Sequence, residues 1–211
     1  MIAEFNDNRT VLRGICDFDL TAVFESGQCF RFERTEEGFE GIALGGYLHV
    51  CKDADALFLY PCTEQDYNEK WKNYFDLDRD YACLFEGADS VLKESLRCAA
   101  GLRILNQPPF ETLISFIISA NNNEKRIRGI VRRLSETFGI PFLFEGRTFY
   151  DFPTPRALAE ADMETLSGIG AGYRAPYIRS TAQMIADGFD LEGLRSLGYE
   201  QAKRELIRLP G

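Results

Sequence analysis

Residues 119–139 read SANNNEKRIRGIVRRLSETFG, and this stretch decides how the second half of the chain is interpreted. Three consecutive asparagines separate an apolar run from a segment with apolar residues at helical spacing, and asparagine favours both helix ends and N-caps. We therefore predict a helix over 124–138 that buries one face. That face carries Ile127, Ile130, Val131, Leu134 and Phe138. The opposite face carries five cations, namely Lys125, Arg126, Arg128, Arg132 and Arg133.

A basic helix face contrasts with the chain as a whole, which is acidic. Its 211 residues carry 33 Asp and Glu against 24 Lys and Arg, so the formal net charge is -9. This balance counts against a general nucleic-acid binder, but it is compatible with a local basic patch on an acidic body. The alternative for the cations is a solvated helix face, which is common without any function.

The pattern changes along the chain from strands to helices. Residues 14–62 contain short aromatic and β-branched runs broken by glycine or charge, which predict antiparallel strands joined by hairpins. Thr63, followed by acidic residues, predicts the start of a helix with aromatic side chains on its buried face. The run 78–101 predicts one or two further helices. From about Arg103 onward we expect helices only, with a loop that begins at Pro141.

These patterns predict an α+β fold with two domains. Residues 1–98 are expected to form an antiparallel sheet domain, and residues 99–211 a helical domain. The boundary between them is expected somewhere between Asp89 and Gln107.

Composition argues against several classes of site. The chain has six cysteines without a C-x-x-C pair and one histidine, His49, so we expect no metal, iron–sulfur site or cofactor. No run of 18 or more apolar residues occurs, so no membrane partner is expected. The N-terminus lacks an apolar secretory run, so we expect a cytosolic, intracellular protein. The cysteines are Cys16, Cys29, Cys51, Cys62, Cys83 and Cys98.

Four stretches follow one another along the chain: SGQCFRF at 26–32, NQPPFETLISFIISANNNEKRIRGIV at 106–131, GIGAGYRAPYI at 168–178 and the terminal LIRLPG. In this order they resemble the 8-oxoguanine DNA glycosylase family of the helix-hairpin-helix superfamily. The resemblance implies a TBP-like sheet domain and then a helical domain whose helix-hairpin-helix motif is incomplete here. It also implies removal of 8-oxoguanine opposite cytosine from duplex DNA. In the family the base is flipped out, a lysine attacks the sugar, and a Schiff base permits strand nicking.

Recognition of the damaged base needs an acceptor on the protein. Guanine N7 is an acceptor in the major groove, whereas N7 of 8-oxoguanine carries a hydrogen. A backbone carbonyl supplies the acceptor, and glycine lets the backbone approach closely. The resemblance assigns this carbonyl to Gly27. The local alternative is a turn glycine between strands.

The cytosine left behind by a flipped base needs donors for its N3 and O2 acceptors. Arginine is a donor-only fork, and an amide adds a further contact. The resemblance assigns these roles to Asn121, Arg126 and Arg174, and it assigns the side chain that intercalates in the stack to Tyr173. The local alternatives are a helix stop with an N-cap for the asparagines and a buried aromatic for Tyr173. Phe116 is expected in the core.

Contacts to DNA phosphates have further candidates in the same region. They are Lys125, Arg128 and Arg132 on the basic helix face, and the backbone of Gly211 at the start of the hairpin loop. For the cations, a solvated helix face is an equal alternative.

No catalytic residue is expected within the 211 residues. The family's nucleophilic lysine lies in a P-G-V-G-x-K sequence, and this chain reads L-P-G at 209–211. Lys203 is no substitute, because an active lysine must be desolvated and its neighbours Arg204 and Arg208 indicate an exposed face. We therefore expect damaged double-stranded DNA as partner but no Schiff-base activity. We also expect apolar surface on the helix that ends near Leu209, and self-association through it.

Three other functions stay open at this point. The first is a non-catalytic protein that binds DNA lesions with the same recognition residues. The second is a helix-hairpin-helix glycosylase for alkylated bases, which the S-G-Q motif and the triple asparagine disfavour. The third is an unrelated interaction module with a basic helix.

Overall fold

The structure is a computed structural model, which describes residues 1–211 except 82, 84–86 and 88. It divides into two compact units, Met1–Gln107 and Pro108–Gly211. An antiparallel sheet lies in the first unit and most of the helices lie in the second, which confirms the predicted α+β order. Residues 99–107, expected in the helical domain, belong to the first unit.

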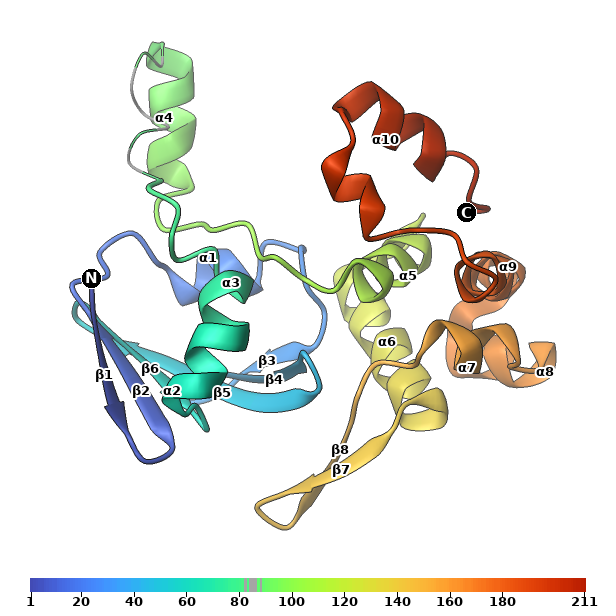
Figure 1. Ribbon diagram of the computed structural model, residues 1–211, viewed down its shortest axis with the longest axis horizontal. Helices are drawn as coiled ribbons and strands as arrows, with labels where there is room; N and C mark the ends of the chain where they lie inside the picture. Colours follow the sequence, from blue (N-terminus) through green and yellow to red (C-terminus); the bar gives the residue numbers. More distant parts are fainter. Residues whose placement is uncertain (82, 84–86, 88) are drawn as a thin grey trace. The chain divides into compact units, whose positions relative to one another are not determined.

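Six strands of the described residues form one antiparallel sheet in the order β1-β2-β6-β5-β4-β3 (Figure 1). Their hairpin connections confirm the predicted antiparallel domain. The first hairpin lies in residues 1–13, which were not predicted as strands. Its turn contains Asp7 at a φ of 39°, a conformation that Asp tolerates. The strands are β1 (Ile2–Asn6), β2 (Arg9–Arg13), β3 (Phe32–Arg34), β4 (Gly38–Ala43), β5 (Gly46–Asp53) and β6 (Ala56–Tyr60).

One face of the sheet carries an aromatic core. In β4 the buried residues Phe39, Gly41 and Ala43 alternate with half-buried ones, as expected for a strand with one covered face. A side chain at Gly41 would come within 2.5 Å of the Phe32 ring, so glycine makes room for that ring. Phe24 stacks on Phe32 with ring centroids 4.4 Å apart, which ties the segment before β3 into the core.

A helical segment covers this face, beginning where Thr63 predicted it (Figure 1). Thr63 and Asp66 form a capping box, in which each side chain accepts from the other residue's backbone N–H. The segment runs through α2 (Glu64–Asp66), the π-helical η1 (Tyr67–Trp71) and α3 (Lys72–Tyr74). The predicted aromatic face is confirmed, since these side chains are buried in the core. They are Tyr67, Trp71, Tyr74 and Phe75.

Two short helices, α1 (Leu20–Phe24) and α4 (Ser90–Cys98), also lie in the described part of the first unit. Within 14–24, predicted as a strand, the structure has helix α1, because the Asp19 carboxylate caps it by accepting from Ala22 N at 2.7 Å. Helix α4 lies in the predicted helical run 78–101. The part of that run at 82, 84–86 and 88 lies outside the described residues.

The second unit is built mainly from helices (Figure 1), and they bury apolar side chains such as Ile114, Ile130 and Ile178. Helix α6 has the predicted bounds, and Ile127, Ile130, Val131 and Leu134 are buried as predicted, whereas Phe138 is half-buried. The helices are α5 (Pro109–Ser119), α6 (Glu124–Phe138), α7 (Pro155–Ala159), α8 (Met163–Leu166), η3 (Ser167–Ala171), η4 (Gly172–Arg174), α9 (Ala175–Ala186), η5 (Gly193–Ser196) and α10 (Tyr199–Leu206).

The prediction of helices only after Arg103 is wrong at one place. A two-stranded hairpin follows α6, formed by β7 (Pro141–Phe144) and β8 (Arg147–Tyr150). Its two turn residues, Glu145 and Gly146, have φ values of 47° and 74°, which is the backbone of a two-residue hairpin turn. Glutamate is not a usual residue at that position, so the turn was missed.

Phe116 is not in the core, contrary to expectation, because its side chain is 50% exposed. Successive helix residues are rotated by about 100°. Ile114 and Ile118 face the core, so Phe116 between them points to the other side of α5. The apolar composition of this helix hid which face is buried.

Candidate nucleic-acid interface

The asparagine junction connects α5 to α6 through a left-handed turn. Asn121 adopts a φ of 48°, a conformation that asparagine tolerates better than most residues. Asn122 Nδ2 donates to Ile118 O at 3.1 Å, and Asn123 Oδ1 accepts from Arg126 N at 3.0 Å. The predicted helix stop and N-cap are therefore confirmed. They leave the Asn121 residue exposed at the corner between the two helices.

Two residues distant in sequence, Arg174 and Tyr173, hold this corner through hydrogen bonds. Arg174 Nε donates to Ala120 O at 2.9 Å, and Nη2 donates to Asn121 O at 3.0 Å and also to Ala120 O. Tyr173 Oη donates to Ala120 O at 3.2 Å. A cation at the carbonyl end of α5 is favourable, because that end carries the negative pole of the helix dipole. The structure thus brings Asn121, Tyr173 and Arg174 together.

The two neighbours differ in exposure. Arg174 is only 4% exposed and lies 4.3 Å from the centre of the Tyr173 ring, whereas Tyr173 is 58% exposed. The buried-aromatic alternative for Tyr173 is therefore wrong, and its ring is accessible to a partner. In this structure the Arg174 side chain acts as a cap for α5 through two of its nitrogens.

A shallow pocket of about 260 Å³ lies beside this corner. The C-terminal residues reach it because Thr181 Oγ1 donates to Pro210 O at 2.6 Å and Leu209 is buried. Gly211, the candidate phosphate contact, is one of the lining residues, and it packs against Ile117 and Tyr177. The others are Ala120, Tyr173 and Arg174.

The five cations of α6 are not equivalent. Lys125 and Arg126 are exposed, and Arg126 is the candidate cytosine contact. Arg128 pairs with Glu124 at 2.8 Å, and Arg132 lies 3.8 Å from Glu136. Such surface pairs on one helix contribute only about 0.3–0.5 kcal/mol, so they are easily exchanged for a phosphate. The fifth cation, Arg133, has a structural task.

Arg133 holds the glycine-rich loop that precedes Tyr173. Its Nε donates to Ile169 O at 2.8 Å. Gly170 has a φ of 96°, and a side chain there would lie 3.0 Å from Arg133 Nη2. Glycine is therefore favoured at 170 by its backbone conformation, whereas the guanidinium is the end of a flexible side chain that could shift. Arg133 is exposed, as expected for a solvated helix face, and the structure reveals in addition its long-range bond.

Gly27 belongs to the first unit. It follows α1 and has a φ of 79°, so a residue with a side chain would be strained at this turn. No atom lies within 4 Å of the place where a Cβ would stand, and the residue is half-buried. The turn-glycine alternative is thus borne out for the backbone conformation, and it is compatible with a carbonyl that a ligand approaches.

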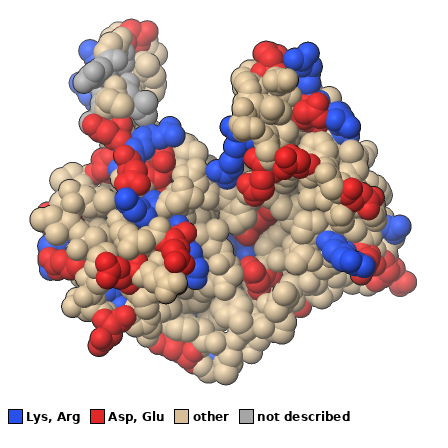
Figure 2. Space-filling view, viewed as in Figure 1, with Lys and Arg blue, Asp and Glu red and all other residues tan. Residues whose placement is uncertain are grey.

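Charge is mixed over the face shown in Figure 2, where Lys and Arg side chains lie among Asp and Glu. Helix α10 illustrates this mixture, with Glu200 and Glu205 beside Lys203 and Arg204. Such mixed charge on one helix does not favour binding to any nucleic acid.

The described residues show no grouped metal ligands, and one buried thiol has a raised pKa. Among them, no three His, Cys, Asp or Glu side chains are grouped to hold a metal ion. Burial raises the pKa of the Cys62 thiol to about 11, so this thiol is protonated near neutral pH. Nor does any helix among them have the length and apolar character to cross a membrane.

Comparison with known proteins points to one family. Residues 11–113 match the family model of the 8-oxoguanine DNA glycosylase N-terminal domain, and residues 114–208 match that of the HhH-GPD superfamily of base excision DNA repair proteins. A probable N-glycosylase/DNA lyase of Methanothermobacter thermautotrophicus is 30% identical, over 92% of this chain and 72% of its own length.

Solved structures agree with the family models. The apo form of the Clostridium acetobutylicum 8-oxoguanine glycosylase/lyase superposes with a TM-score of 0.95 and 34% identity, covering 100% of this chain and 75% of that one. The same protein has been solved with double-stranded DNA containing cytosine opposite 8-oxoguanine, with a TM-score of 0.94, 35% identity, and 99% and 73% of the two chains covered. A 3-methyladenine DNA glycosylase of Archaeoglobus fulgidus shares the fold at 18% identity, with a TM-score of 0.71, over 94% of this chain and 73% of that one.

Proposed function

Because the chain belongs to the 8-oxoguanine DNA glycosylase family, whose N-glycosylase/DNA lyases act in base excision repair, we propose that it binds duplex DNA with 8-oxoguanine opposite cytosine. One observation carries the proposal. In the second unit, Arg174 and Tyr173 hold Asn121 at a left-handed corner, and the exposed Arg126 begins the next helix from the same corner.

The damaged base is recognised by a backbone acceptor. The Gly27 carbonyl accepts a hydrogen bond from N7–H of 8-oxoguanine. N7 of an undamaged guanine is itself an acceptor, so it forms no hydrogen bond with this carbonyl. Two features support this role: the positive φ of Gly27, and the empty space around its Cα. A single hydrogen bond of the wrong polarity costs about 1.4 kcal/mol, which corresponds to about tenfold in affinity.

The opposite cytosine is held by Asn121 and Arg126. Both are exposed at the corner, so both are accessible to a base. Arg174 contributes by fixing the corner, and Nη1, the one nitrogen that its capping bonds do not use, can face the cytosine. Tyr173, with its ring accessible, fills the space that the flipped base leaves. Lys125, Arg128, Arg132 and the Gly211 backbone are the proposed phosphate contacts.

The chemical step of the family needs an activated lysine. The second unit contains two lysines, Lys125 and Lys203, and both are exposed. A nucleophilic lysine must be desolvated or otherwise activated, and exposure to solvent gives neither side chain such surroundings. We therefore propose that residues 1–211 by themselves recognise the lesion without forming a Schiff base.

Binding to labelled duplexes tests the function. We expect residues 1–211 to bind a duplex with 8-oxoguanine opposite cytosine about tenfold more tightly than the matching guanine duplex. Arg126→Ala should weaken binding to the lesion duplex by about tenfold, since a two-pronged base contact is lost. The matched control is Arg156→Ala, which removes an exposed arginine of α7 paired with Glu160 and should change affinity by less than about twofold.

Each other outcome has a definite meaning. Equal affinity for the two duplexes overturns the proposal, and preference for an alkylated base favours the alkyl-base glycosylases. Failure to bind any duplex favours an interaction module. Adding borohydride to the bound lesion duplex should trap no adduct. A covalent adduct would refute only the proposal that residues 1–211 form no Schiff base.

Self-association through α10 is a separate expectation. Tyr199, Leu206 and Ile207 are exposed at this helix and its end, which leaves apolar surface in contact with water. We expect the average mass in sedimentation to rise above 24.0 kDa with concentration. Ile207→Glu should suppress the rise, whereas Val91→Glu, at an equally exposed apolar site on α4, should not. A mass that stays constant with concentration would contradict the expectation.

A further inference from the structure

The side chain next to Gly27 forms hydrogen bonds with three backbone groups of the first unit. Gln28 Nε2 donates to Val23 O and to Arg103 O, both at 2.9 Å. Gln28 Oε1 accepts from Leu105 N at 2.9 Å, and the Gln28 backbone O accepts from Gln107 Nε2 at 2.6 Å. The side-chain amide thus uses both donors and its acceptor on backbone groups, two of which lie more than seventy residues away in sequence.

These bonds define where the Gly27 turn stands. Ser26 Oγ donates to Val23 O at 3.2 Å, so the residues on both sides of Gly27 are bonded to the same carbonyl near the end of α1. Gly27 itself has no side chain, and no atom packs into the space beside its Cα. Its carbonyl is therefore held in place by its neighbours, and Gln28 makes most of these bonds.

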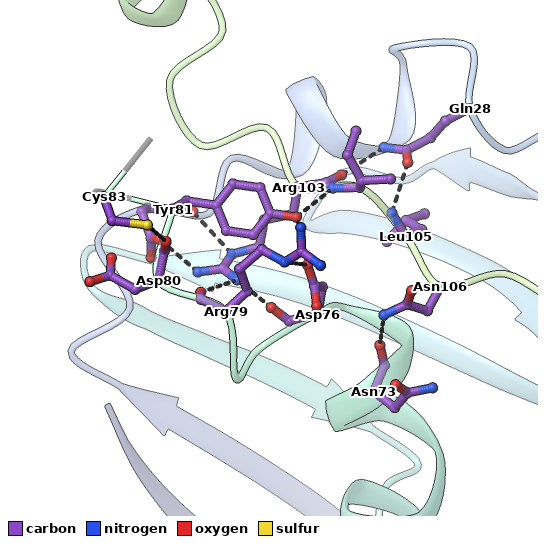
Figure 3. A network of polar contacts seen from close by, with 12 residues as sticks. Gln28, Asn73, Asp76, Arg79, Asp80, Tyr81, Cys83, Arg103, Leu105 and Asn106 are labelled. Atoms are coloured by element: carbon purple, nitrogen blue, oxygen red, sulfur yellow. Dashed lines mark hydrogen bonds and ion pairs between the residues drawn. The ribbon is translucent and has the colours of Figure 1, made fainter. Parts of the chain in front are cut away.

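The segment to which Gln28 is bonded, residues 103–107, is itself firmly held (Figure 3). Arg103 is 3% exposed and Asn106 donates from Nδ2 to Asn73 O at 2.8 Å. The Asn106 backbone N–H also donates to Tyr74 O at 2.9 Å. Gln28 therefore joins a glycine turn to a fixed frame, and that frame ends at Gln107, the last residue of the first unit.

We propose that Gln28 is a positioning residue for lesion recognition: it fixes the direction of the Gly27 carbonyl by bonding the turn to residues 103–107. The proposal rests on the role of Gly27 given above. Hydrogen bonds weaken steeply with angle and distance. If the direction of the Gly27 carbonyl is not fixed, the carbonyl loses its preference for a donor at N7. Contacts to phosphates and to the opposite cytosine are unchanged.

The test compares Gln28→Ala with Asn106→Ala, which removes an amide that bonds the same segment on its other side. Affinities are measured for the 8-oxoguanine and guanine duplexes, each opposite cytosine. Gln28→Ala should reduce the preference for the lesion by about tenfold, with affinity for the guanine duplex changed by less than about twofold. Asn106→Ala should keep the preference for the lesion, even where it lowers the unfolding midpoint by as much as Gln28→Ala does.

Amide hydrogen exchange supplies a readout that does not depend on DNA. In Gln28→Ala the Leu105 N–H has lost its acceptor, so it should exchange faster, and so should the amides of residues 26–29. If the unaltered chain shows no lesion preference, the proposed function fails, and exchange alone still tests the bond to Leu105. Faster exchange with the lesion preference intact would overturn the positioning role. Equal loss of preference in both variants would also overturn it, because a general structural effect would then account for the result.

Discussion

Replacing Arg174 with alanine is expected to lower the free energy of unfolding by about 2–3 kcal/mol. The side chain is 4% exposed and donates to the last two carbonyls after α5, at Ala120 and Asn121. Hydrogen bonds from a charged donor contribute about 1.5–3 kcal/mol each. Ala120 and Asn121, whose carbonyls accept these bonds, lie at the surface, so water replaces part of the lost bonding. The loss of the guanidinium also removes the stacking partner of Tyr173.

The same variant should weaken binding of lesion DNA, because the Asn121 corner is no longer held. Urea unfolding measures the stability change, and Arg179→Ala, at an exposed position on α9, is the control with an expected change below about 0.5 kcal/mol. Arg174→Lys should recover less than half of the loss, since one ammonium cannot bond both carbonyls in the geometry of the fork. A variant as stable as the unaltered chain would contradict the capping role.

Local patterns predicted the parts of the fold that depend on neighbours in sequence. Helix α6 was predicted to the residue because its buried face repeats at helical spacing and Asn123 supplies the cap. The helix after Thr63 was predicted for the same reasons. Helix α1 and the hairpin β7–β8 were missed, since a five-residue helix has too few residues to show a period and the hairpin turn contains a glutamate.

The candidate site divides in the same way. The helix stop and cap at Asn121–Asn123 are local, so the sequence predicted them. The tasks of Gln28, Arg133 and Arg174 are not local, because each side chain donates to a backbone carbonyl of a segment distant in sequence. No spacing rule encodes such a bond. Resemblance to a family placed Arg174 in the site, but it did not predict that the free protein uses this side chain as a helix cap.

The second large effect is expected at Arg103, which anchors the frame behind Gln28 (Figure 3). Its Nη2 pairs with the Asp17 carboxylate at 2.6 Å, its Nη1 donates to Asp76 O at 2.7 Å, and its guanidinium lies 4.6 Å from the Tyr81 ring centre. Tyr81 Oη donates to the Asp76 carboxylate at 2.8 Å and accepts from Ile104 N at 3.0 Å. Burial, together with the Asp76 carboxylate, raises the pKa of Tyr81, so the phenol stays protonated as the donor.

Arg103→Ala should therefore lower the free energy of unfolding by about 3 kcal/mol, measured by urea unfolding. Losing one partner of a buried pair costs about 3–5 kcal/mol, but the Asp17 side chain is 45% exposed and regains water, which places the effect at the lower end. Arg97→Ala is the matched control, because its pair with Glu94 lies at the surface and should contribute less than about 0.5 kcal/mol. A loss below about 1 kcal/mol in Arg103→Ala would mean that the frame holds without its central cation. The position of the Gly27 turn would then have to depend on the Asn106 bonds instead.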